Sequence, residues 1–385
     1  MNTKWVSTWG TALERCDETP ETMPKLPLAG TTVRQIIRPT TSGSRIRLRL
    51  SNEYGKKDLL IGALHIAKQV KADESVIYDN TDAIITFNGN EEMLIPAGET
   101  IITDDIEYDV KALENIAISV YITDAPVEDV TGHRGARATT YQMKGNNVSK
   151  KEFSDYETTT SWFFVSDVSI LTEEKAKAVV CFGDSITDGY GTDALYLGRK
   201  PDSYTRWIDY LAKRFQANEE TKHISLINEG IGGNSILAAW PTDAGKDRFE
   251  RDVTSHDGVE YCIILFGVND LEKLPDTSKY EKLIAEYKKM IEICHSHGIK
   301  VYMSPILPFG TSGHYSEASE KVRSMINEWI RSKESKVDGI IEFDKALEDK
   351  DNPVRLQEKY THEDGLHPYD GYDVMAEAVE LSMFV

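Results

Sequence analysis

The hydrophobic pattern of this chain changes its period close to residue 175. Before that point, apolar and polar residues alternate. In SRIRLRLS (44–51), the three apolar side chains fall on one face and the three arginines on the other. The same theme continues in residues 59–66, 115–122 and 162–171. Alternation in many short segments separated by turn-forming residues is typical of half-buried strands. We therefore predict an all-β, jelly-roll-like sandwich domain over residues 1–175.

After residue 175, apolar strand-like runs alternate with amphipathic helical segments. The predicted strands cover residues 178–182, 223–228, 261–267, 300–305 and 339–343. One predicted helical face is formed by Tyr204, Trp207, Ile208, Leu211 and Phe215. Nearly continuous apolar strands that alternate with helices indicate a parallel sheet covered on both faces. The sequence thus predicts a three-layer α/β domain over residues 176–385, with a boundary near the charged segment TEEKAK (172–177).

Short polar segments follow the strands of this second half. GDSIT comes after the first strand, NEGIGGNS after the second and GVND after the third, while DGLHP opens the last helix-like segment. Ligands of parallel α/β sheets bind beyond the carboxyl ends of the strands. We therefore expect these four segments to form one site.

The residue types in these segments suit acyl transfer through a serine. A serine hydroxyl needs a base within hydrogen-bonding reach, and the base needs an acceptor that orients it. Asp364 and His367 are three residues apart, so one tight turn can bring the carboxylate to the imidazole and leave Nε2 facing Ser185. The backbone N–H of Gly233 and the amide of Asn269 can stabilise a developing oxyanion. Each feature alone also fits an ordinary turn, cap or surface pair, but their order along the chain favours a catalytic site.

These four segments resemble the conserved blocks of the SGNH (GDSL) hydrolase superfamily. The resemblance covers roughly residues 176–385 and implies a flavodoxin-like hydrolase fold with no metal and no organic cofactor. It implies that Ser185 is the nucleophile and first oxyanion donor, and that Gly233 and Asn269 are the other oxyanion donors. It further implies that Asp364 orients His367, which acts as general base and acid.

A looser resemblance covers the first half. WVSTWGTA, TVRQIIR, RIRLRLSNEYG and TGHRGARATTY are similar to the β-sandwich that precedes the hydrolase in a subfamily of acylhydrolases from xylan-degrading rumen bacteria. This resemblance implies O-deacetylation of carbohydrates. The first half has no catalytic constellation of its own, so we expect it to support the hydrolase domain.

Charge and segment composition limit the partners of the chain. It carries 64 acidic and 44 basic residues, a formal net charge of −20. Such a surface repels phosphate backbones, which argues against a nucleic-acid partner. We find no polybasic patch, no transmembrane segment and no signal-peptide core, so we expect no membrane partner and a cytoplasmic location. The four cysteines are scattered without a CxxC pair. The oligomeric state stays open.

Other candidate motifs fit less well. GIGGNS is not a phosphate-binding loop, and the serine turn is not the GxSxG elbow of α/β-hydrolases. His295 and His297 are two residues apart on a predicted helix, which does not suit a metal pair. His362 lacks an acid three residues upstream. His133 is either a residue that reaches the cleft or an ordinary loop histidine, and Trp240 is either a sugar-stacking platform or a core or hinge residue.

The sequence therefore predicts a serine esterase whose substrate is an acetylated oligosaccharide or another small ester. Two alternatives stay open. A lipolytic or aryl esterase would use the same triad, and a carbohydrate-binding protein could carry a non-catalytic hydrolase domain. An intact Ser185, Asp364 and His367 argue against the second alternative.

Overall fold

The computed structural model describes residues 2–16 and 24–385, which divide into two compact units. The first unit contains the described residues up to Ala176 together with residues 193–204, and the second contains residues 177–192 and 205–385. The chain therefore leaves the second unit after its first strand and helix, and returns to it at Thr205.

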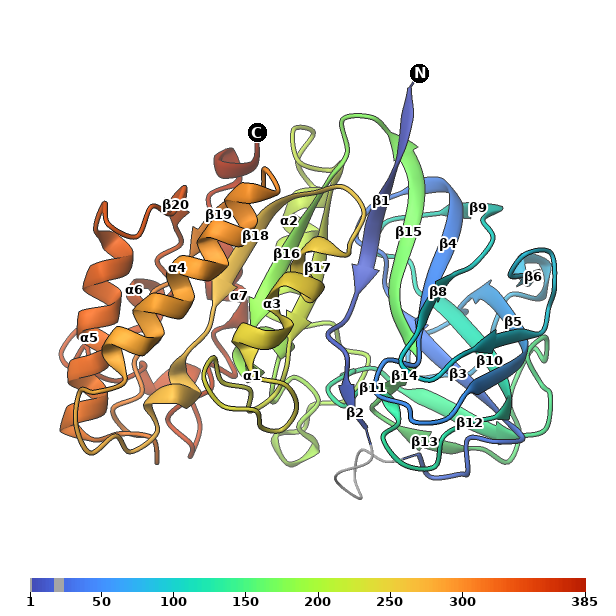
Figure 1. Ribbon diagram of the computed structural model, residues 1–385, viewed down its shortest axis with the longest axis horizontal. Coiled ribbons are helices and arrows are strands. Elements are labelled where there is room, and N and C mark those ends of the chain that lie inside the picture. Colours follow the sequence, from blue (N-terminus) through green and yellow to red (C-terminus); the bar gives the residue numbers. More distant parts are fainter. Residues whose placement is uncertain (1, 17–23) are drawn as a thin grey trace. The chain divides into compact units, whose positions relative to one another are not determined.

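The first unit is built from antiparallel strands (Figure 1). In the described residues, one sheet has the order β1-β15-β4-β8 with β9 paired to β4, and another has the order β13-β12-β3-β10-β5-β6 with β7 paired to β5. A smaller sheet has the order β14-β11-β2. The strands are β1 (Thr3–Gly10), β2 (Glu14–Arg15), β3 (Thr31–Ile37), β4 (Gly43–Ser51), β5 (Leu59–Lys68), β6 (Ala83–Ile84), β7 (Met93–Ile95), β8 (Thr100–Ile102), β9 (Ile106–Val110), β10 (Ile116–Asp124), β11 (Thr131–His133), β12 (Thr140–Lys144), β13 (Glu157–Thr159), β14 (Trp162–Phe163) and β15 (Val165–Glu173).

Strand β4 shows why the alternating sequence forms these sheets. Ile46, Leu48 and Leu50 are fully buried, whereas the arginines between them are only partly buried. These apolar side chains join a hydrophobic cluster that also takes Ile61 from β5 and Val120 from β10. The two larger sheets thus contribute to one core, as expected when every second residue of each strand faces inward.

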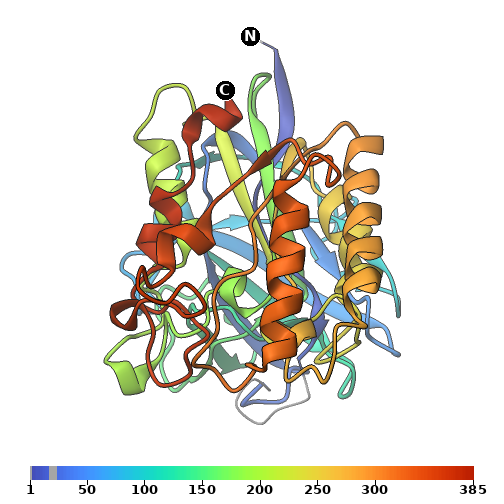
Figure 2. The same ribbon diagram turned by 90° about the vertical axis from the view of Figure 1, so that its left-hand side faces the viewer.

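The second unit is a parallel sheet with helices on both faces. Its strand order is β17-β16-β18-β19-β20, and each neighbouring pair is parallel. Figure 2 shows α3 and α4 on one face of this sheet and α2 with α7 on the other. The strands are β16 (Lys177–Gly183), β17 (Ile224–Gly230), β18 (Val259–Leu265), β19 (Lys300–Met303) and β20 (Gly339–Ile340). The helices are α1 (Ser185–Asp188), α2 (Trp207–Gln216), α3 (Gly245–Thr254), α4 (Tyr280–Ser296), α5 (Glu317–Arg331), α6 (Phe343–Leu347) and α7 (Tyr372–Glu377). The predicted parallel α/β sheet is confirmed.

Helix α2 differs from its prediction at the N-terminal end. Trp207, Ile208, Leu211 and Phe215 form its buried face as expected. Tyr204 does not belong to that face, because the helix begins only at Trp207 and residues 193–204 belong to the first unit.

Several contacts hold residues 193–204 within the first unit. Asp202 accepts hydrogen bonds from the backbone N–H (3.0 Å) and the hydroxyl (2.5 Å) of Thr139. Arg137 pairs with Asp193 at 3.2 Å, and the guanidinium of Arg38 lies 3.3 Å from the ring centroid of Tyr204. The prediction from helical periodicity is therefore wrong for Tyr204, because its ring packs against the guanidinium of Arg38 instead of on the helix face.

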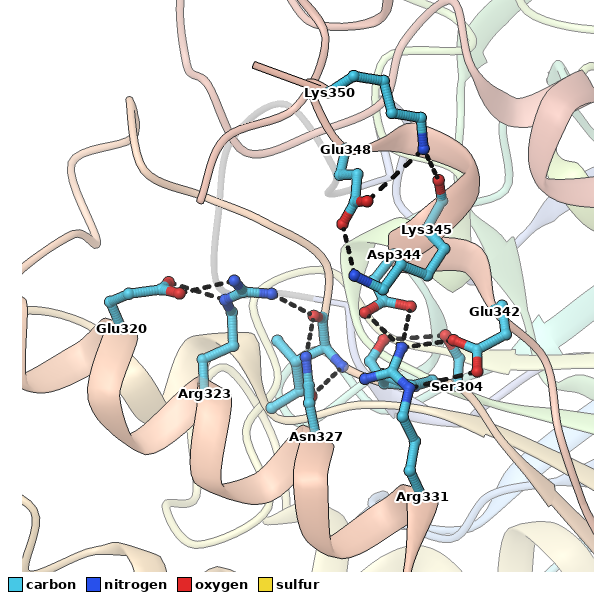
Figure 3. Close-up of polar contacts among 12 residues, drawn as sticks. Ser304, Glu320, Arg323, Asn327, Arg331, Glu342, Asp344, Lys345, Glu348 and Lys350 are labelled. Carbon is cyan, nitrogen blue, oxygen red and sulfur yellow. Dashed lines mark hydrogen bonds and ion pairs between the residues drawn. The ribbon is translucent and has the colours of Figure 1, made fainter. Parts of the chain in front are cut away.

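A network of ion pairs joins α5 to α6 in the second unit (Figure 3). Arg331 donates to both carboxylate oxygens of Asp344 at 2.8 and 2.7 Å, and it also pairs with Glu342. The Asp344 side chain is only 4% exposed, and burial raises its pKa despite the hydrogen bonds from Arg331. The network lines a cleft of about 630 Å³, in which the charged groups already pair with one another.

Arg331→Ala is expected to lower the free energy of unfolding by about 3 kcal/mol, because it leaves the buried carboxylate of Asp344 without its cation. Urea denaturation monitored by circular dichroism measures the change. The matched control is Lys350→Ala, which removes an ion pair from a side chain that is 70% exposed and is expected to cost at most about 0.5 kcal/mol. Equal losses in the two variants would contradict this account of the network.

Candidate active site

Ser185 lies at the first turn after β16, on the short helix α1. Asp184 caps this helix, and its carboxylate accepts a hydrogen bond from the N–H of Ile186 at 3.0 Å. Gly183 is required by close packing, because a Cβ there would come within 2.4 Å of the carbonyl oxygen of Leu265. Gly189 ends the helix in the left-handed conformation, with φ of 91°. The sequence GDSITDG thus folds into a tight turn that fixes the serine at the carboxyl end of β16.

Ser185, His367 and Asp364 form a connected hydrogen-bonded row. Oγ of Ser185 lies 2.8 Å from Nε2 of His367, and Nδ1 of His367 lies 2.7 Å from Oδ2 of Asp364. The turn between the acid and the histidine is closed by the backbone N–H groups of Leu366 and His367, which donate to Oδ1 of Asp364 at 2.9 and 3.1 Å. This arrangement lets the imidazole accept the serine proton while the carboxylate holds its other nitrogen.

Two tyrosines complete the surroundings of the histidine. The hydroxyl of Tyr369 donates to Oδ2 of Asp364 at 2.6 Å, the same oxygen that faces His367. Burial raises the pKa of Asp364, but the hydrogen bonds from His367 and Tyr369 outweigh it and hold the pKa well below its usual range. The ring of Tyr190 packs on the imidazole with centroids 4.3 Å apart. Asp364 therefore stays ionised at neutral pH, and the imidazole is held on both its edge and its face.

Gly233 and Asn269 follow the two strands that flank β16. Gly233 has φ of 78°, and a Cβ there would lie 2.6 Å from Cζ3 of Trp240, so glycine suits both the backbone and the space. The amide Nδ2 of Asn269 donates to the backbone oxygen of Asn234 at 2.7 Å, which ties the third segment to the second. Because β17, β16 and β18 are parallel neighbours, Ser185, Gly233 and Asn269 all lie at the carboxyl edge of the sheet.

Hydrogen-bond donors are available at this edge. Among the described residues, the backbone N–H groups of Ser185 and Gly233 have no acceptor. Asn269 uses one of its two amide hydrogens on Asn234 and is partly exposed. These three N–H donors therefore lie at the same edge of the sheet as the hydroxyl of Ser185.

A buried network around Arg248 connects the segments that contain Ser185 and Gly233. Arg248 donates to the carbonyl oxygens of Gly183 and Glu229, both at 3.0 Å, and to Oδ1 of Asn234 at 2.9 Å. Its charge is balanced by Asp252 at 2.7 Å. Arg248 thereby links the end of β16 to the end of β17 and to the loop that contains Gly233.

Two buried carboxylates next to Ser185 and Asn269 in the sequence, Asp184 and Asp270, have raised pKa values. Burial raises the pKa of Asp184 to about 7, and the nearby Asp270 adds to the shift. Burial also raises the pKa of Asp270 to about 6, although its carboxylate accepts hydrogen bonds from the N–H groups of Ile236 and Leu237. Asp270 thus fixes the loop after Gly233.

The other residues considered from the sequence lie in different surroundings. His362 pairs with Asp370 at 3.0 Å rather than with the serine. His133 is not in a loop: it lies in β11 of the first unit and is buried, with Nδ1 2.9 Å from the carbonyl oxygen of Ala12. Trp240 is 67% exposed, so the core interpretation of that residue is wrong. His295 pairs with Asp338 at 3.0 Å.

The described residues contain no group of three or more histidine, cysteine or acidic side chains arranged to hold a metal ion. None of the helices in this part of the chain combines the length and the apolar character that a membrane crossing needs.

Three residues beside the candidate site did not stand out in the sequence. Tyr369 and Tyr190 lie close to the DGLHP and GDSIT segments, so their proximity along the chain could have indicated them. His314 contacts Asn269, with Nε2 3.3 Å from Oδ1, but it comes from the loop after β19. No spacing in the sequence links His314 to Asn269, 45 residues away.

Part of the chain is similar to a known protein family. Residues 181–372 match the model of the GDSL-like lipase/acylhydrolase family. This segment is thus similar to the GDSL-like lipase/acylhydrolase family. The family is one of esterases, and its matched range begins in β16 and ends at the start of α7. A search of curated proteins found no match.

The chain is also similar to solved structures. A GDSL-like lipase from Bacteroides thetaiotaomicron is 21% identical, with a TM-score of 0.40 over 55% of this chain and 90% of that one. A carbohydrate acetylesterase from Sinorhizobium meliloti is 20% identical, with a TM-score of 0.39 over 52% and 95%. A variant of an acetyl xylan esterase from Geobacillus stearothermophilus is 20% identical, with a TM-score of 0.39 over 52% and 92%.

Proposed function

We propose that this protein is a serine esterase in which Ser185 is the nucleophile, His367 the general base and acid, and Asp364 the residue that orients His367. The observation that carries the proposal is the row of hydrogen bonds of 2.8 and 2.7 Å from Oγ of Ser185 through the imidazole to Asp364. A serine hydroxyl is a weak nucleophile until an adjacent base accepts its proton.

The reaction proceeds in two halves. Oγ of Ser185 bonds to the ester carbonyl carbon while its proton passes to Nε2 of His367, and the carbonyl electron pair moves onto oxygen. The tetrahedral intermediate then collapses, and His367 gives the proton to the departing alcohol. Water attacks the acyl-serine in the same way, which releases the carboxylic acid and restores Ser185.

The oxyanion of each tetrahedral intermediate accepts hydrogen bonds from the N–H groups of Ser185 and Gly233 and from Nδ2 of Asn269. Their positions at the ends of β16, β17 and β18 support this role. Such donors stabilise the transition state because they are already oriented before charge develops.

We further propose that the substrate is an acetyl ester of a carbohydrate. The exposed indole of Trp240 beside Gly233 supports this choice, because a flat aromatic surface next to the reacting group can pack against a sugar ring. The strongly acidic chain, with a net charge of −20, also suits a polar, uncharged substrate better than an anionic lipid. The first unit, which consists of the described residues up to Ala176 together with residues 193–204, is proposed as a β-sandwich domain without a catalytic site; the predicted boundary at residue 175 therefore leaves out residues 193–204.

The acyl specificity can be tested with a series of nitrophenyl esters and acetylated xylo- and mannooligosaccharides. We expect kcat/KM to be at least about tenfold higher for the acetate than for the octanoate, because a short pocket rejects a long chain by steric overlap. We also expect release of acetate from at least one acetylated oligosaccharide, and none with Ser185→Ala. A higher kcat/KM for octanoate would favour the lipolytic alternative.

A further inference from the structure

His314 occupies a fixed position on the loop between β19 and α5. Its carbonyl oxygen accepts hydrogen bonds from the N–H of Lys273 at 2.9 Å and from Oγ of Ser319 at 3.3 Å. Its own N–H donates to Oγ of Ser312 at 3.2 Å. The loop is thus attached both to the segment that follows Asn269 and to the first turns of α5, so the imidazole has a defined place.

The imidazole of His314 faces the amide of Asn269. Nε2 lies 3.3 Å from Oδ1 of Asn269, and on the other side of the amide Nδ2 lies 2.7 Å from the carbonyl oxygen of Asn234. If the amide were flipped, Oδ1 would face the Asn234 carbonyl, and two acceptors would meet. The two contacts therefore specify one orientation of the amide, which leaves the second Nδ2 hydrogen free.

The surroundings also specify the protonation of His314. Burial lowers its pKa, and the nearby His367 lowers it further while Glu272 opposes the shift. A neutral imidazole carries one proton, and the acceptor Oδ1 places that proton on Nε2.

We propose that His314 is a positioning residue that holds the Asn269 amide with its free N–H directed at the oxyanion. This inference rests on the proposed esterase function and deepens it. A hydrogen bond accepted by Oδ1 polarises the amide and makes Nδ2 a stronger donor, since linked hydrogen bonds reinforce one another. His314 thus acts through Asn269 and does not touch the substrate.

The test compares His314→Leu with His314→Gln on nitrophenyl acetate. The leucine variant removes the donor and is expected to lower kcat about tenfold with KM nearly unchanged, the scale of one hydrogen bond. The glutamine variant places an N–H close to the position of Nε2 and is expected to retain most of the activity. His297→Leu, which replaces an exposed histidine at the end of α4, serves as the matched control and should behave as wild type.

A double-mutant cycle separates positioning from a general effect on structure. In the Asn269→Ala background, His314→Leu should cause almost no further loss, because the amide it positions is absent. A full tenfold loss in that background would overturn the proposal, as would an unchanged kcat in the folded leucine variant. Thermal unfolding checks that each variant is folded.

Two further outcomes are distinguishable. If the leucine variant does not fold, His314→Asn takes its place, because its shorter amide does not reach Oδ1 of Asn269 and should give the same loss. If the wild-type protein has no esterase activity that depends on Ser185, the proposed function itself is wrong. If the activity depends on Ser185 but kcat is unchanged in the His314→Leu variant, the positioning role of His314 is wrong and the proposed esterase function stands.

Discussion

Ser185→Ala and His367→Ala are each expected to lower kcat for nitrophenyl acetate by several orders of magnitude, roughly 10⁴- to 10⁶-fold. Without Oγ there is no acyl-enzyme, and without the imidazole the hydroxyl keeps its proton. Because the two groups act as a unit, the double variant should be hardly less active than either single variant. Initial rates with purified, folded protein measure the effect.

The matched control for the serine substitution is Ser296→Ala. Ser296 is exposed on α4, where its hydroxyl donates to the carbonyl oxygen of Ile293, and its removal should leave kcat unchanged. If Ser185→Ala kept full activity while remaining folded, another group would have to be the nucleophile. Losses that multiply in the double variant would mean that the two residues do not share one step.

Asn269→Ala is expected to lower kcat about 10²- to 10³-fold, the usual cost of one oxyanion donor, with a much smaller change in KM. The donor acts on charge that develops only in the transition state, so ground-state binding hardly depends on it. The inhibition constant of a boronic acid, which forms a tetrahedral anionic adduct with serine, should rise by a similar factor.

The control for this substitution is Asn352→Ala, at an exposed position in the loop after α6. It should change neither kcat nor the inhibition constant. If Asn269→Ala raised KM and left kcat intact, Asn269 would be a substrate-binding residue and the oxyanion hole would consist of backbone N–H groups alone.

The sequence predicted the second unit well because its signals are local. Ser185, Gly233 and Asn269 each follow an apolar run directly, and in a parallel sheet the ends of neighbouring strands meet at one edge. Asp364 and His367 lie within one turn of the chain, so their contact depends on little beyond that turn. The alternating pattern of β4 likewise specified which side chains are buried.

Other features depend on contacts that no local pattern encodes. His314 reaches Asn269 only because the loop after β19 is attached to Lys273 and Ser319. Tyr204 has the spacing of a helical core residue, yet its ring packs against Arg38, far away in the sequence. Periodicity reports which face of an element is apolar, and it contains no information on the loop conformations that bring distant side chains together.

Residues 193–204 affect the order in which the two units can fold during synthesis of the chain. The first unit cannot be completed when residue 176 leaves the ribosome, because Thr139 and Arg137 still lack Asp202 and Asp193. By the time those partners emerge, β16 and α1 of the second unit have already been made. Neither unit corresponds to one uninterrupted stretch of the sequence. If the chain were divided at residue 176, the N-terminal fragment would lack residues 193–204, which belong to its unit. The C-terminal fragment would contain those residues without their partners Thr139 and Arg137.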